Sequence, residues 1–214
     1  MIIISNLTKK FEGKIILENL NFSFQPGMVY GFWGQNGVGK TTLFKCISGL
    51  ETFEGSIQSE FSPLKNKIGL LLADPFILNR ITGEEYVHLL CSARGVKIKD
   101  IEKFNIFKLP LNEFAINYSL GMKKKLALTA ILLQNNEMFI LDEPFNGIDM
   151  FGKNKIEEII KQLKHDNKII LISSHDLIAL KRNCDKIIFL KSESVSTSFD
   201  KEDFEKLDQE ILNL

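Results

Sequence analysis

The first third of the chain gathers β-branched and aromatic residues into short segments that end at glycine or proline. This pattern predicts β-strands, with breaks at Gly13 and at Pro26–Gly27. The predicted strands are residues 1–11, 15–24, 28–34, 55–59 and 66–74. After the third strand and a glycine-rich loop, residues 40–50 place Leu43, Ile47 and Leu50 on one face, which predicts a helix.

The middle of the chain changes to a helical period. Residues 77–117 carry this pattern, and its clearest segments are residues 83–95 and 99–109. We interpret approximately residues 76–130 as a helical insertion.

Two strongly apolar runs mark the second half of the chain. They are Met138–Pro144 and Lys168–His175, and a lysine-rich helix is predicted between them at 153–164. An apolar strand, a helix and another apolar strand are typical of buried parallel strands joined by crossover helices. A further strand is predicted at 185–194 and a terminal amphipathic helix at 200–214. The pattern as a whole predicts an α/β fold.

Composition narrows the class of protein. The 214 residues predict one domain, residues 1–214, and Lys+Arg and Asp+Glu both number 27, so the zero net charge disfavours a nucleic-acid partner. Cys46, Cys91 and Cys184 are widely spaced, as expected for small core residues in a reducing compartment. No apolar run approaches the roughly 18 residues of a spanning helix. We therefore expect a cytoplasmic protein that reaches a membrane only through a partner.

A phosphate-binding loop follows the third predicted strand. The segment Gly34–Thr42, GQNGVGKTT, fits the pattern G-x-x-x-x-G-K-[ST] between a strand and a helix. Its backbone N–H groups would surround a nucleotide β-phosphate, Lys40 would reach the β- and γ-phosphates, and the Thr41 hydroxyl would bind Mg²⁺. The candidate nucleotide contacts are Gly34, Asn36, Gly37, Gly39, Lys40, Thr41 and Thr42.

Carboxylates and a histidine follow the two apolar runs. Asp142 and Glu143 end the first run, where Asp142 would hold Mg²⁺ and Glu143 would polarise the attacking water. His175 ends the second and could donate a hydrogen bond to the γ-phosphate. Because ligands of open α/β sheets bind at the carboxyl ends of the strands, we expect these groups to meet the phosphate loop. Glu143, His175 and Lys40 are the candidate catalytic residues.

The segment Tyr118–Leu126, YSLGMKKKL, is a predicted helix start with an unusual charge. Ser119 is a typical capping residue, Gly121 permits a close approach to the backbone, and three lysines follow. Positive charge at a helix N-terminus opposes the helix dipole unless an anion docks there. This segment therefore predicts a second anion contact.

These motifs in this order resemble the nucleotide-binding subunits of ABC transporters, nearly end to end. Gly34–Thr42 is similar to the Walker A motif of that family, Ser119–Lys123 to its signature motif and FILDEP to its Walker B motif with the following glutamate. Asn146–Asp149 is similar to the D-loop, His175 to the switch histidine, and Phe11 occupies the place of the aromatic residue that stacks on adenine. The SLGMK variant is similar to the form found in exporters of antibiotic peptides and related drugs.

The resemblance implies a P-loop NTPase fold with an N-terminal antiparallel β-subdomain and the helical insertion. It also implies an ATPase that uses ATP and Mg²⁺, powers export through a transmembrane permease, and sits on the inner face of the membrane through that permease. Two ATP-binding subunits would pack head to tail, so that Ser119, Gly121 and Asp149 of one copy contact ATP held by the other. A homodimer is expected, and no nucleic acid.

One position departs from the family pattern. The family has a glutamine that contacts Mg²⁺ and the attacking water, and Ala73 occupies its place, with Asp74 next to it. An alanine side chain can do neither. Besides a transport ATPase, two interpretations stay open: an ABC-type ATPase acting on nucleic acid or ribosomes, and an ATP-binding regulatory subunit that hydrolyses poorly.

Overall fold

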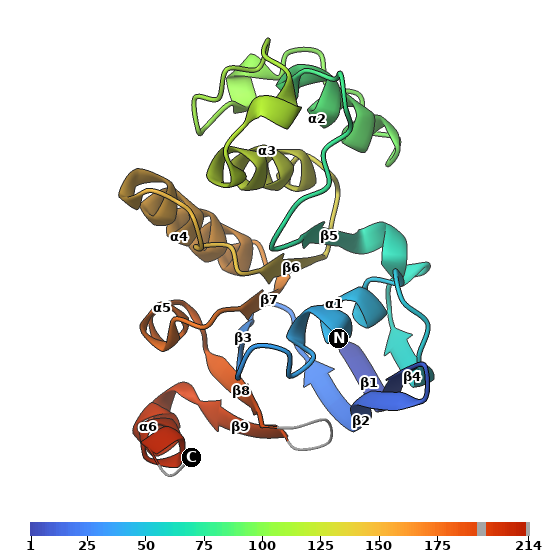
Figure 1. Ribbon diagram of the computed structural model, residues 1–214, viewed down its shortest axis with the longest axis vertical. Coiled ribbons are helices and arrows are strands. Elements are labelled where there is room, and N and C mark those ends of the chain that lie inside the picture. Colours follow the sequence, from blue (N-terminus) through green and yellow to red (C-terminus); the bar gives the residue numbers. More distant parts are fainter. Residues whose placement is uncertain (192–195, 213–214) are drawn as a thin grey trace.

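The computed structural model describes residues 1–191 and 196–212, and its main element is a six-stranded sheet (Figure 1). The strand order is β5 (Ile68–Leu71), β6 (Met138–Asp142), β7 (Ile169–Ser173), β3 (Val29–Trp33), β8 (Lys186–Leu190) and β9 (Ser196–Asp200). The first five strands pair in parallel, and β9 pairs antiparallel with β8. The predicted α/β fold with a mainly parallel core sheet is therefore confirmed.

A second sheet lies beside the first. It is antiparallel, with the order β2 (Lys14–Phe24), β1 (Ile2–Phe11) and β4 (Glu54–Ser59), and it is the predicted N-terminal antiparallel β-subdomain. The helix α1 (Lys40–Ile47) follows β3 of the first sheet and precedes β4 of the second. Its apolar side chains belong to a cluster that contains residues of both sheets (Figure 1).

The remaining helices follow the parallel strands or are inserted between them. Residues between β5 and β6 contain α2 (Gly83–Ser92) and α3 (Leu120–Leu132), which lie together at one end of the molecule (Figure 1). α4 (Met150–His165), α5 (Leu177–Asn183) and α6 (Phe204–Leu212) come after β6, β7 and β9. Among residues 1–191 and 196–212, no helix has both the length and the apolar character needed to cross a bilayer.

The alternation of side chains in the parallel strands divides the core into two clusters. On β3, Val29 belongs to the cluster with α2 to α6, whereas Tyr30 and Phe32 belong to the cluster with α1 and the antiparallel sheet. Both faces of the central sheet are thus buried, which explains the continuous apolar runs in its strands.

Some predicted elements differ from the structure. The helix predicted at 99–109 is wrong except for a 3₁₀ turn at Glu102–Phe104, because the Asn105 side chain bonds both the N–H and the carbonyl of Leu109 and closes a loop instead. Of the strand predicted at 185–194, residues 192–194 lie outside the described residues, as do residues 213–214 of the terminal helix. The short elements β9 and α5 were not predicted.

Parallel pairing brings three loops to one edge of the sheet. Ser173 of β7 pairs with Asp142 of β6 and with Phe32 of β3. The loops that follow these strands begin with Gly34, Glu143 and Ser174, so the sequence motifs meet at the carboxyl end of the sheet.

Candidate active site

The phosphate loop joins β3 to α1, and the Lys40 side chain at its end bonds back to the first residues of the loop. Lys40 is 8% exposed, and its Nζ donates to the carbonyl oxygens of Gly34 at 2.6 Å and Gln35 at 3.1 Å. Burial lowers the pKa of Lys40, and the nearby carboxylates of Glu143 and Asp142 act in the opposite direction. Gly39 caps the helix with a φ of 102°, a conformation that a residue with a side chain rarely adopts.

A cavity of about 190 Å³ opens between this loop and the end of β6. Residues from two predicted motifs line it: Asn36, Gly37, Gly39, Lys40, Thr41, Thr42, Asp142 and Glu143. The fold therefore brings together a phosphate loop and two carboxylates that lie about a hundred positions apart in the sequence.

Asp142 is held at the floor of this site by two hydroxyl groups. It is 1% exposed, the Thr41 Oγ1 donates to its Oδ2 at 2.6 Å, and the Ser173 Oγ donates to its Oδ1. A hydroxyl and a carboxylate side by side are hard oxygen donors, which suit Mg²⁺ shared with substrate phosphates. The sequence analysis missed Ser173, although its place at the end of an apolar strand, two residues before His175, is a usable signal.

Glu143 and His175 form a pair at the mouth of the site. The distance from His175 Nδ1 to Glu143 Oε2 is 2.9 Å, and the glutamate side chain is 15% exposed whereas the histidine is 61% exposed. The Glu143 N–H donates to Ser173 Oγ at 3.0 Å. A water molecule could reach this carboxylate from the phosphate cavity, which is the geometry that a general base needs.

Ser119, Gly121 and Asp149 lie apart from the cavity. Ser119 caps α3, where its Oγ accepts from the Met122 N–H at 3.2 Å, and Asp149 caps α4, where its Oδ1 accepts from the Gly152 N–H at 2.7 Å. That second hydrogen bond lowers the pKa of Asp149, and the bonded Lys125 ammonium adds to it. A methyl group at Gly121 would overlap the Gly147 carbonyl oxygen, so the close approach foreseen for this glycine is made within the chain.

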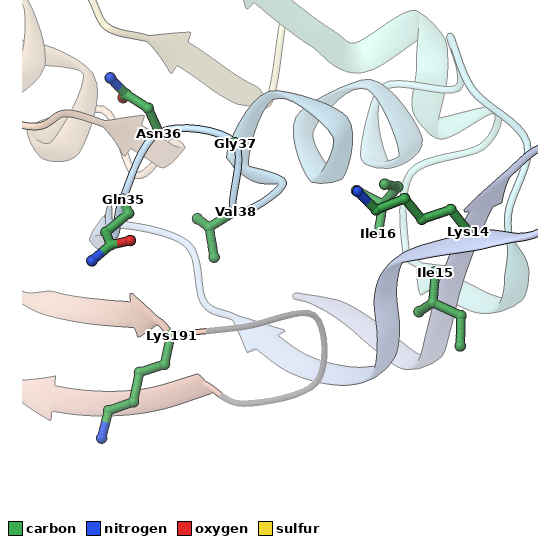
Figure 2. Close-up of a pocket in the computed structure, with 8 residues that line it drawn as sticks. All are labelled: Lys14, Ile15, Ile16, Gln35, Asn36, Gly37, Val38 and Lys191. Atoms are coloured by element: carbon green, nitrogen blue, oxygen red, sulfur yellow. The ribbon is translucent and has the colours of Figure 1, made fainter. Parts of the chain in front are cut away.

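A second cavity, of about 280 Å³, lies beside the phosphate loop and shares Asn36 and Gly37 with the first (Figure 2). Lys14, Ile15 and Ile16 of β2 face Gln35–Val38 across it, and Lys191 follows β8 below the loop (Figure 2). Phe11 does not line either cavity. It is 42% exposed at the end of β1, and the Lys9 ammonium lies 4.5 Å from the centre of its ring.

Sequence reasoning missed Lys124. The lysines of this helix start predict an anion contact, but Lys124 is 1% exposed and its Nζ donates to the carbonyl oxygens of Glu143 at 2.7 Å and Asn146 at 2.9 Å. Its position three residues after Gly121 and four before the buried Leu128 is the signal that could have found it. Ala73, at the predicted glutamine position, is half-buried, and Asp74 is exposed.

The profile of the ABC transporter family matches residues 17–146. The lantibiotic transport ATP-binding protein SrtF of Streptococcus pyogenes is 32% identical over 204 residues, which cover 89% of this chain and 86% of SrtF. The bacitracin transport ATP-binding protein BcrA of Enterococcus faecalis is 32% identical over 196 residues, which cover 85% of this chain and 63% of BcrA, less than two thirds of its length.

A solved structure has the same fold. It is the dimeric post-hydrolysis state of the ATP-binding cassette MJ0796 bound to ADP and Pi, with a TM-score of 0.83, 21% sequence identity, and coverage of 94% of this chain and 99% of that one.

Proposed function

Since the chain belongs to the ABC transporter family, we propose that it binds and hydrolyses ATP and powers export through a separately encoded membrane permease. The observation that carries this proposal is the single cavity shared by Lys40, Thr41, Asp142 and Glu143. A buried cation, a hydroxyl, a metal-binding carboxylate and a base on one cavity are the parts that phosphoryl transfer to water requires.

Each residue of the site would have a separate role in hydrolysis. Lys40 and the N–H groups of the phosphate loop bind and orient the triphosphate. Glu143 accepts a proton from the attacking water. His175 Nδ1, 2.9 Å from Glu143 Oε2, holds the carboxylate in place, and its Nε2 donates toward the γ-phosphate when both ring nitrogens carry a proton. Thr41 and Asp142 would hold Mg²⁺, which neutralises charge on the phosphates when it is bound.

We further propose that two copies complete the sites. The N-terminus of α3 at Ser119 and Gly121 would face the γ-phosphate held by the other copy, with Asp149 beside it, and Phe11 would stack on the adenine through the ring face opposite Lys9. The structural relative MJ0796 is described as dimeric. Residues 76–130 would form the helical subdomain that meets the permease, which would place the protein on the inner face of the membrane.

The names of two relatives support a proposal for the cargo class. BcrA and SrtF are named for the transport of bacitracin and a lantibiotic, both antibiotic peptides. We propose that this chain serves an exporter of the same type.

The substitution Glu143→Gln tests the function. The amide keeps the shape of the side chain but cannot accept the proton, so ATP turnover should fall at least ~100-fold while the Kd for ATP stays within about threefold. Turnover is measured by phosphate release and binding by calorimetry. The control Glu158→Gln, on the exposed face of α4, should behave as wild type. Normal turnover in Glu143→Gln would refute the proposal.

A further inference from the structure

The Lys124 ammonium is buried at a place where the fold gives it no carboxylate to bond directly. Among the described residues its Nζ hydrogen bonds go to two carbonyl oxygens, those of Glu143 and Asn146, on the loop between β6 and α4. Burial lowers the pKa of Lys124, and the more distant carboxylates of Glu143, Asp142 and Asp74 oppose that shift. Burying an ammonium group costs free energy that a leucine at this position of α3 would not cost.

Glu143 has a main-chain conformation that needs support. Its φ is +49°, a left-handed value that is uncommon for a residue with a side chain and that persists only where neighbouring contacts hold it. Its N–H is held by the Ser173 Oγ at 3.0 Å and its carbonyl by Lys124 at 2.7 Å. The two contacts hold the peptide groups before and after the Glu143 Cα. They thereby set the direction in which the side chain leaves the main chain, toward His175.

We propose that Lys124 is a positioning residue for hydrolysis, which holds the Glu143 main chain so that its carboxylate faces the phosphate cavity. The inference rests on the proposed function of Glu143. A charged donor suits this role because its hydrogen bonds are stronger than those of a neutral amide. Lys124 thereby connects the helix that begins at Ser119 to the base in the same chain.

The competing explanation is that Lys124 merely fastens α3 to the loop. Gly121 against Gly147 and Lys125 with Asp149 make further contacts between the same two elements, so loss of Lys124 could reduce stability alone. The two explanations differ in one measurable respect. A fastening role is independent of the Glu143 side chain, whereas a positioning role disappears once that carboxylate is removed.

The test is a double-mutant cycle of Lys124→Met and Glu143→Gln, measured as single-turnover ATP hydrolysis with ATP binding and thermal unfolding alongside. We expect Lys124→Met to slow hydrolysis about 10- to 100-fold, the size of effect that a misplaced catalytic group produces, with the Kd for ATP within about threefold. In the Glu143→Gln background the same change should slow hydrolysis by less than about threefold. Lys124→Gln, which keeps one donor on a shorter side chain, should recover part of the rate, and it replaces the methionine variant if that one does not fold.

The control Leu128→Ala lowers the stability of the same helix from inside the core, and it should lower Tm without this loss of rate. Equal losses from Lys124→Met in both backgrounds, or a wild-type rate in Lys124→Met, would overturn the positioning role while the role of Glu143 stands. A wild-type rate in Glu143→Gln itself would overturn the proposed function and the role of Lys124 with it.

Discussion

At the residue scale, the structure separates side chains that motifs could identify from those that only packing reveals. Lys40, Thr41 and Asp142 stand in motifs whose spacing reflects what a phosphate loop and a metal-binding strand end need, and the fold places them on one cavity. Lys124 and Ser173 stand in no such pattern. Their places in the sequence can indicate that each is buried near the site, but their bonds to Glu143 join different elements, so the local pattern does not predict these partners.

Asp74 lies next to Ala73, which occupies the place of the family's glutamine, and its role can be predicted. Asp74 is exposed in the bend after β5, so we expect Asp74 not to replace the missing glutamine. Asp74→Ala should then change steady-state ATP turnover by less than about twofold, because it removes no contact made in the transition state. A loss of about tenfold, with a shallower Mg²⁺ dependence, would show instead that its carboxylate helps to hold the metal or the water.

At the scale of elements, apolar runs predicted the parallel strands because both faces of that sheet are buried. The helix predicted at 99–109 was wrong because Asn105 offers its backbone a competing set of hydrogen bonds. The strand β9 has the sequence STSFD, in which Phe199 alone is buried, so it lacks an apolar run. Short or half-polar elements at the rim of a fold depend on their neighbours more than on their own pattern.

The close contact between α3 and the loop after β6 leads to a prediction about stability. Gly121 packs directly against the Gly147 carbonyl, so a methyl group there must displace the backbone. Gly121→Ala should lower the free energy of unfolding by about 1–3 kcal/mol, the usual cost of overpacking, despite the better helix propensity of alanine. Urea unfolding measures the change, with Leu120→Ala as the control, because Leu120 is 42% exposed and that variant removes atoms. Unchanged stability in Gly121→Ala would show that the loop can move away from the methyl group without a cost in free energy.

At the scale of the whole molecule, large apolar side chains stand exposed at the starts of three helices around the site. They are Leu120 of α3, Met150 and Phe151 of α4, and Ile178 of α5, between 42% and 80% exposed. Large exposed apolar side chains, where they lie together, are typical of an interaction surface. The proposed head-to-tail dimer would cover it and would bring α3 to the phosphate held by the other copy.

This arrangement predicts that assembly depends on ATP. We expect the Glu143→Gln protein to keep ATP bound without hydrolysing it, so it should be a dimer with ATP and a monomer without it, as measured by light scattering. Adding Ser119→Arg should keep it monomeric with ATP present, because the exposed α3 N-terminus would carry a bulky side chain where the partner's phosphate has to fit. Ser56→Arg, on the exposed side of β4, adds the same charge away from this edge and should leave the dimer intact. If the Glu143→Gln protein stays monomeric under both conditions while it binds ATP, the head-to-tail arrangement is wrong.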